Sequence, residues 1–248
     1  MRLAWLAPLL LCCFPLRAAE PVSLLVVTDL WPPFRMQNAE GTLHGLDIDV
    51  LNQLSLRTGL RFKVQRAPWA RGLAALGQGR ADLMTGLAKT PEREAYIDYL
   101  PQPYYACSPR FYTTPERASA LRDYDQLADL SIGYVLESAY FEPFDSDRRL
   151  NKVGVTTETQ LLDMLVRGRL QAIIGTDCQV DYQLRDLQWA TRIVKAAYRP
   201  EFRTELYIGF SRQRGLSAEY RTLSKALDQL QAEGWIAQAA RRYQVAGP

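Results

Sequence analysis

The segment from Leu24 to Gly86 alternates short apolar runs with helical patterns, and this alternation restricts the chain to a small group of folds. The run 24–28 is continuously apolar up to its last residue, which is typical of a strand buried on both faces. A helix capped by Asp47 and ended by Gly59, strands at 61–65 and 83–86, and a helix at 69–76 follow. This order predicts a parallel, doubly wound sheet.

A second, shorter unit follows the same logic. We expect a strand at 131–135, a helix at 158–167 and a strand at 170–176, with helices at 218–232 and 235–243 closing the chain. Extended segments at 104–113 and 205–211 would carry the chain between the units. The sequence therefore predicts an α/β protein with two lobes, each a doubly wound sheet flanked by helices, joined by two hinge crossings. Lobe I would comprise residues 20–106 and 207–248, and lobe II residues 107–206.

The first residues have the pattern of a signal peptide. Arg2 supplies a positive charge, 3–16 is apolar, and Ala18 and Ala19 are small residues suited to cleavage. The apolar stretch is too short to span a membrane and contains two prolines. We expect residues 1–19 to be removed and the mature protein to be periplasmic.

Charge and motifs exclude several classes of function. Removing Arg2 and Arg17 with the signal peptide lowers the formal charge from +3 to +1, and no basic run remains, which argues against a nucleic-acid partner. The chain has a single histidine, His44, and no Cys/His cluster at metal spacing, no glycine-rich phosphate loop and no Ser-His-Asp set. We expect no metal, no cofactor and a monomeric protein.

Two cysteines remain after signal-peptide removal, Cys107 and Cys178. In an oxidising compartment, two remaining cysteines suggest one disulfide. The alternative is two separate buried thiols.

Polar and aromatic residues follow the predicted strands at their carboxyl ends, where α/β sheets bind ligands. If the lobes face each other rim to rim, these residues share one cleft, whose composition suits a small molecule with charges and a planar or apolar part. The candidate ligand contacts are Asp29, Trp31, Trp69, Thr85, Gly86, Ala88, Arg93, Ser138, Ala139 and Asp177.

Arg93 is the leading anchor candidate because a guanidinium presents a planar fork of donors that matches a carboxylate. Each candidate also has a purely structural interpretation. Arg93 would then pair with Glu92 or Asp98 at the surface, Asp177 would cap the helix that follows it, and Asp29 would hold its own turn. The two tryptophans would be ordinary core aromatics.

Five motifs in order resemble bacterial extracellular solute-binding protein family 3, the periplasmic polar-amino-acid receptors of ABC importers, with a periplasmic binding protein type II fold. They are Thr28-Asp29-Leu30-Trp31-Pro32-Pro33-Phe34, Gly45-Leu46-Asp47-Ile48-Asp49, Pro68-Trp69, Gly79-Arg80-Ala81-Asp82 and Thr90-Pro91-Glu92-Arg93. The resemblance implies that Arg93 holds the ligand carboxylate, Asp177 the ammonium group, and Trp31 and Trp69 the side chain. It also implies a small-molecule ligand and an ABC permease partner.

The chain departs from the family pattern at two places. Ala88 stands where many relatives have a hydroxyl residue, and Leu136-Glu137-Ser138-Ala139 replaces a Gly-Thr stretch. The sequence predicts a solute-binding protein for an importer. A sensory receptor is an alternative, as is a dehydratase of prephenate-like acids in which a buried Glu137 would be the general acid.

Overall fold

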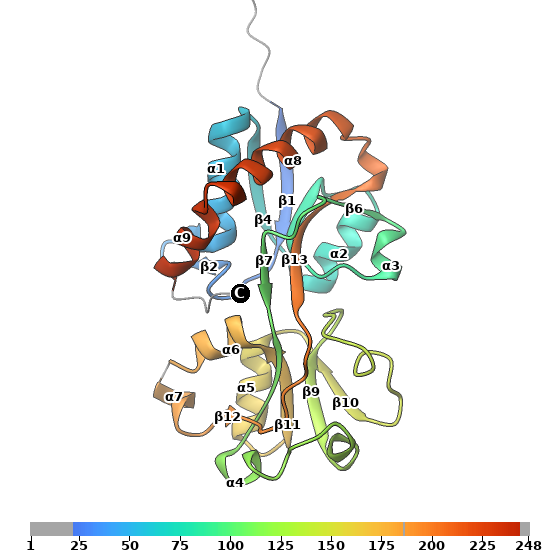
Figure 1. The fold of residues 1–248 in the computed structure, drawn as a ribbon, viewed down its shortest axis with the longest axis vertical. Helices are drawn as coiled ribbons and strands as arrows, with labels where there is room; N and C mark the ends of the chain where they lie inside the picture. Colours follow the sequence, from blue (N-terminus) through green and yellow to red (C-terminus); the bar gives the residue numbers. More distant parts are fainter. Residues whose placement is uncertain (1–21, 186, 244–248) are drawn as a thin grey trace, which may run out of the picture.

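Two β-sheets lie one above the other and are joined by two extended segments in the computed structural model, which describes residues 22–185 and 187–243 (Figure 1). We call the part built on the first sheet lobe I and the part built on the second lobe II. The signal peptide predicted at 1–19 lies outside the described residues. Within the described part of the chain, no helix has both the length and the apolar character needed to cross a membrane.

The sheet of lobe I has the strand order β4-β1-β5-β13-β6. Its strands are β1 (Ser23–Thr28), β4 (Arg61–Arg66), β5 (Leu83–Leu87), β6 (Ile97–Tyr99) and β13 (Thr204–Ser211). β1 runs parallel to β4 and β5, whereas β13 returns antiparallel to β5 and β6. The strand–helix–strand prediction for this lobe is therefore confirmed, with an antiparallel strand added from the far end of the chain.

Helices cover both faces of this sheet. α1 (Leu46–Thr58) packs with α8 (Ser217–Ala232) and α9 (Trp235–Arg242), while α2 (Trp69–Gly77) packs on β1, β5 and β13. Separate apolar clusters fill the two interfaces. Short elements complete the lobe: β2 (Met36–Gln37), β3 (Leu43–His44), α3 (Pro91–Glu94) and η2 (Arg212–Arg214).

The sheet of lobe II has the strand order β10-β9-β11-β8-β12. It consists of β8 (Pro109–Thr113), β9 (Ser131–Val135), β10 (Asn151–Val155), β11 (Ala172–Thr176) and β12 (Val194–Lys195). β10 was not predicted because only one of its five residues is buried. Around the sheet lie α4 (Pro115–Ala118), η1 (Asp125–Asp129), α5 (Glu158–Val166), α6 (Asp177–Gln183) and α7 (Leu187–Ala190).

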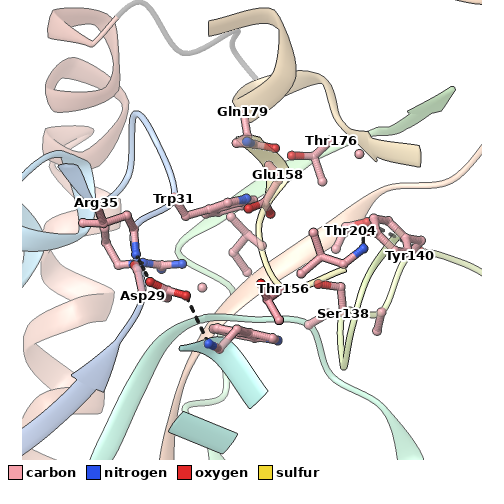
Figure 2. Close-up of a pocket in the computed structure, with 18 of the residues that line it drawn as sticks. Asp29, Trp31, Arg35, Ser138, Tyr140, Thr156, Glu158, Thr176, Gln179 and Thr204 are labelled. Atoms are coloured by element: carbon pink, nitrogen blue, oxygen red, sulfur yellow. Dashed lines mark hydrogen bonds between the residues drawn. The ribbon is translucent and has the colours of Figure 1, made fainter. Parts of the chain in front are cut away.

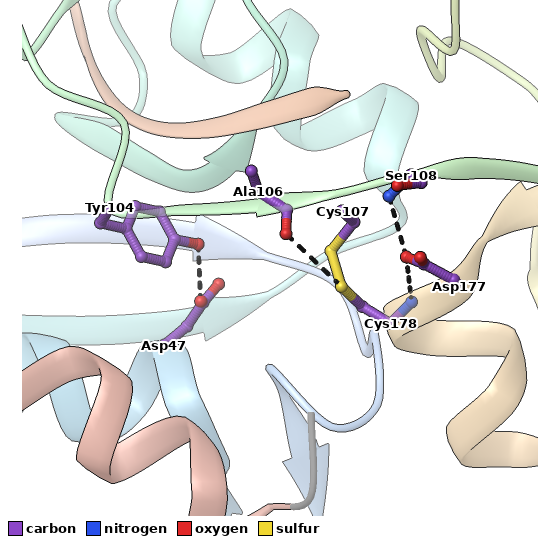
Figure 3. The surroundings of a disulfide bond; sticks show 7 residues. All are labelled: Asp47, Tyr104, Ala106, Cys107, Ser108, Asp177 and Cys178. Atoms are coloured by element: carbon purple, nitrogen blue, oxygen red, sulfur yellow. Dashed lines mark hydrogen bonds between the residues drawn. A yellow bond between two sulfur atoms is a disulfide. The ribbon is translucent and has the colours of Figure 1, made fainter. Parts of the chain in front are cut away.

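The two crossings between the lobes lie side by side (Figure 1). β7 (Tyr105–Cys107) pairs antiparallel with the start of β13, so both crossings are held by backbone hydrogen bonds. Cys107 at the end of β7 forms a disulfide with Cys178 in α6, as predicted, and the two Cα atoms are 5.7 Å apart (Figure 3). The bridge ties a hinge strand to a helix of lobe II.

The sequence suggested that Asp47 caps α1, and this prediction is wrong. The N-cap residue is Gly45, whose φ of 122° is a glycine conformation, and a Cβ there would lie 2.4 Å from the carbonyl oxygen of Phe34. Asp47 lies two residues further on, in the first turn of α1, and is fully buried. Its carboxylate accepts hydrogen bonds from Tyr104 (2.6 Å), Thr85 (2.7 Å) and Arg35 (2.5 Å). Asp47, which has the residue type of a helix cap, is instead the common acceptor of a buried hydrogen-bond network.

Candidate functional site

A cavity of about 70 Å³ lies between the lobes and is lined by residues of both. Eight of the ten candidate contacts line it: Asp29, Trp31, Trp69, Gly86, Ala88, Arg93, Ser138 and Ala139. Thr85 and Asp177 do not; Thr85 is buried, and its hydroxyl donates a hydrogen bond to Asp47. The lining residues that the sequence did not point to include Arg35, Thr156, Glu158, Thr176 and Gln179. Figure 2 shows most of this set.

Arg35 is the main addition on the lobe I side. It is 2% exposed, and its guanidinium carbon lies 5.2 Å from the ring centre of Trp31 and 5.9 Å from that of Trp69. Its Nε donates to the backbone oxygen of Asp29 (2.9 Å) and its Nη1 to Asp47. The sequence feature that could have pointed to Arg35 is that it is the only charged residue in the run 31–36.

Asp29 holds the ends of two elements together. Its carboxylate accepts hydrogen bonds from the backbone amides of Leu30 (2.8 Å) and Trp69 (3.2 Å), and it lies 3.5 Å from Nε of Arg66. The carboxylate therefore links the end of β1 to the first residue of α2. Asp29 therefore has the structural role that the sequence offered as the alternative to ligand binding, and it also lies in the cavity wall.

Arg93 is buried in the cleft and not paired at the surface. It is 7% exposed, and Asp98, its possible surface partner, pairs with Arg212 instead. Nη1 of Arg93 donates to the carbonyl of Ala88 (2.9 Å), and Nη2 donates across the cleft to the carbonyl of Glu137 (2.5 Å). The threonine at the start of α3 caps this short helix through the amide of Arg93, which fixes where the side chain begins.

Glu137 contributes its backbone and not its carboxylate. Its φ of 61° is unusual for a residue with a side chain, and its carbonyl accepts from both Arg93 and Nε1 of Trp69 (3.1 Å). The side chain is exposed and does not line the cavity. The alternative in which Glu137 is a general acid requires a carboxyl buried between the lobes, and the exposed side chain does not meet this requirement.

Lobe II contributes the polar residues Thr176 and Gln179 to the cavity wall. Thr176 at the end of β11 is 8% exposed and Gln179 in α6 is 1% exposed. Thr176 Oγ1 and Gln179 Oε1 are both buried and make no hydrogen bond with any described residue. The amide nitrogen of Gln179 is already used, because it donates to Gln183. Figure 2 shows both residues on the wall that also contains Glu158.

Glu158 is the first residue of α5, and it is partly buried beside the cavity. The net pKa of its carboxyl is raised to about 7, mainly by burial and to a smaller extent by the charge of Asp29, whereas a backbone hydrogen bond and the charge of Arg35 act to lower the pKa. At neutral pH this carboxyl therefore changes between a hydrogen-bond donor and an anion.

Asp177 lies on the hinge side, next to the disulfide (Figure 3). Its Oδ1 accepts hydrogen bonds from the backbone amides of Ser108 (2.8 Å) and Cys178 (2.8 Å), so it holds the start of α6 against the hinge strand. It lies close to Cys107 and Cys178, but both sulfur atoms belong to the disulfide and offer no thiolate to a metal. Thr176, one residue earlier, is the residue that lines the cavity.

The order of strands, the cleft between two sheets and the paired crossings agree with a known family. The model of the bacterial extracellular solute-binding proteins, family 3, matches residues 24–246. This chain belongs to that family.

Solved structures with the same two-lobed fold include an amino-acid ABC transporter substrate-binding protein from Streptococcus pneumoniae bound to L-arginine. It is 17% identical, with a TM-score of 0.78 over 89% of this chain and 94% of that one. A histidine kinase sensor domain with similarity to periplasmic binding proteins is 15% identical, with a TM-score of 0.81 over 92% of this chain and 98% of that one. This chain therefore has the periplasmic binding protein type II fold.

Curated relatives include the virulence sensor protein BvgS of Bordetella pertussis, which is 27% identical over 169 residues. That match covers 66% of this chain but only 13% of the sensor protein. A probable histidine-binding protein of Neisseria gonorrhoeae is 25% identical over 126 residues, covering 50% of this chain and 38% of that protein. The chain thus spans only part of the length of the curated relatives it matches.

The cavity of this family 3 protein has two guanidinium groups and the Asp29 carboxylate on the lobe I wall, and hydroxyl, amide and carboxyl groups on the lobe II wall. Lobe I supplies the guanidinium groups of Arg35 and Arg93 with two tryptophan rings, and lobe II supplies Thr176, Gln179 and Glu158. Such an arrangement is complementary to a small molecule that accepts hydrogen bonds at one end and donates them at the other.

Proposed function

We propose that the protein is a periplasmic solute-binding protein that closes on a small zwitterionic or carboxylated ligand, an amino acid or an analogue, and delivers it as a monomer to an ABC importer. One observation carries the proposal. Arg93 lines the cavity from lobe I, and Thr176 and Gln179 line it from lobe II, where their buried Oγ1 and Oε1 have no hydrogen-bond partner among the described residues. A buried polar group without a partner costs about 1–3 kcal/mol, which a ligand donor would recover.

The ligand carboxylate would bind Arg93 and replace the carbonyl of Glu137 as the acceptor for Nη2. The ammonium group would meet Gln179, Thr176 and Glu158. We place it there and not at Asp177, because the Asp177 carboxylate already accepts from two backbone amides at the hinge. Since carboxylate and ammonium are held by different lobes, binding favours the closed arrangement.

The test is a thermal-shift screen of the mature protein with amino acids, small carboxylates and amines. We expect at least one amino acid or carboxylate to raise the melting temperature. Arg93→Ala should abolish that shift without unfolding the free protein. Arg71→Ala, an exposed arginine on α2 of the same lobe, is the matched control and should keep it. A ligand shift that survives in Arg93→Ala would refute the anchor assignment.

A sensory receptor is the second candidate, and the comparisons favour it specifically. The relatives from Bordetella are sensor proteins, and one structural neighbour is a histidine kinase sensor domain. Uptake of the identified ligand by cells with and without this gene separates the two candidates. Loss of uptake in the deletion strain supports transport, and unchanged uptake supports sensing.

A further inference from the structure

A cationic side chain of the protein itself lies next to both cavity tryptophans. The guanidinium of Arg35 lies within cation–π distance of both rings, 5.2 Å from the centre of Trp31 and 5.9 Å from that of Trp69. A ligand side chain that enters this part of the cavity therefore meets a fixed cation and not two bare aromatic faces.

Arg35 is held so firmly that a ligand would not displace it. Its Nη1 bonds the fully buried carboxylate of Asp47, and its Nε bonds the backbone of Asp29. Gly86 also leaves room for it, because a Cβ at that position would lie 2.5 Å from Nη1. Moving the guanidinium would leave Asp47 as a buried charge without its counter-ion, which is strongly unfavourable.

One part of the guanidinium remains available. Nη2 of Arg35 donates no hydrogen bond to any described residue, and Arg35 is among the residues that line the cavity. This nitrogen can therefore offer N–H donors to a bound ligand. Arginine has no acceptor, so the complementary ligand group must be an acceptor.

We propose that Arg35 determines the specificity of this site for amino acids whose side chains carry a carboxylate or a carboxamide, and that it excludes lysine and arginine. This inference rests on the proposed function and adds the class of ligand. An acceptor side chain would accept a hydrogen bond from Nη2, whereas a lysine or arginine side chain would bring only donors to a group that is itself a donor. The similar structure bound to L-arginine therefore does not predict the ligand of this chain.

Isothermal titration of the mature protein with L-glutamate, L-aspartate, L-glutamine, L-asparagine, L-lysine and L-arginine tests the proposal. We expect at least one acidic or amide amino acid to bind roughly tenfold or more tightly than both cationic ones, since a hydrogen bond to a charged group has about that effect. Comparing the acids with their amides shows which acceptor is preferred. Equal or tighter binding of lysine or arginine would overturn the proposal.

A variant pair connects the preference to Arg35. Arg35→Met alone leaves Asp47 without its counter-ion, so the double variant Arg35→Met/Asp47→Asn is used beside it. In the double variant the preference should fall to within about threefold, while binding of alanine, which needs only the carboxylate and ammonium contacts, persists. Arg71→Met is the control. A preference that survives in the double variant would refute the role of Arg35; failure of every amino acid and carboxylate to bind the wild-type protein would refute the proposed function instead.

Discussion

Replacing Asp47 by Asn should destabilise lobe I strongly, although the two side chains have nearly the same shape. The Asp47 carboxylate is fully buried and accepts hydrogen bonds from Arg35, Thr85 and Tyr104 at 2.5–2.7 Å. Asparagine removes the negative charge and turns one acceptor into a donor, which then faces groups that are themselves donors. Arg35, itself 2% exposed, would become a buried cation without a counter-ion.

Breaking a buried ion pair from one side costs about 3–5 kcal/mol. In a chain of this size that corresponds to a fall in melting temperature of roughly 6–20 °C. The control is Asp49→Asn on the same helix, because Asp49 pairs with the mostly exposed Arg242 and should contribute no more than about 1 kcal/mol. The double variant Arg35→Met/Asp47→Asn should recover at least half of the loss, since it removes the unpaired charge.

The assay is urea unfolding followed by tryptophan fluorescence and by circular dichroism, because two probes show whether the two lobes unfold together. The quantity compared is the free energy of unfolding of each variant relative to wild type. If Asp47→Asn costs no more than Asp49→Asn, or if the double variant is less stable than Asp47→Asn, the description of a buried, charge-dependent network is incorrect.

Two further predictions concern the disulfide and the pH. Reducing the Cys107–Cys178 bridge, which spans 71 residues, should lower the free energy of unfolding by about 4 kcal/mol in the chain-entropy model, as measured by denaturation of the wild-type protein with and without reductant; equal stabilities would contradict this. Because the folded-state pKa of Glu158 is raised to about 7, its contribution to stability is greatest below pH 4.5 and is lost as the pH rises to 7. Glu158→Gln should therefore show a flatter fall of unfolding free energy between these pH values, and identical slopes would refute the assignment.

The parts of the fold with a regular pattern were predictable from the sequence. Buried strands such as β1 and β9 show as apolar runs, and helices such as α2 and α5 show an apolar stripe, because burial repeats with the period of the element. β10 has little burial and so leaves no comparable signal.

Site residues were predictable where their position after a strand places them in the cleft. They were not predictable where contacts with residues distant in the sequence place them there. Arg93 and the two tryptophans follow strand ends, so the crevice rule finds them. Arg35 and Asp47 depend on each other and on Tyr104, which is 57 residues from Asp47, and no local pattern records such a contact. The sequence could not decide whether Thr176 or Asp177 lines the cavity. The two residues are neighbours at the junction of β11 and α6, where successive side chains point in different directions.

The disulfide has a mechanical consequence for how the cleft opens. It binds α6, the helix that carries Gln179, to the end of β7, and so holds one point of lobe II at a constant distance from the hinge. Any separation of the lobes must then be a rotation about this fixed point and not a translation. Gln179 lies a single residue from the bridge and should move little, whereas the contact between Arg93 and Glu137 must break. We expect the lobe II wall that contains Gln179 to stay nearly fixed relative to the hinge, and the lobe I side that carries Arg93 to move away from it.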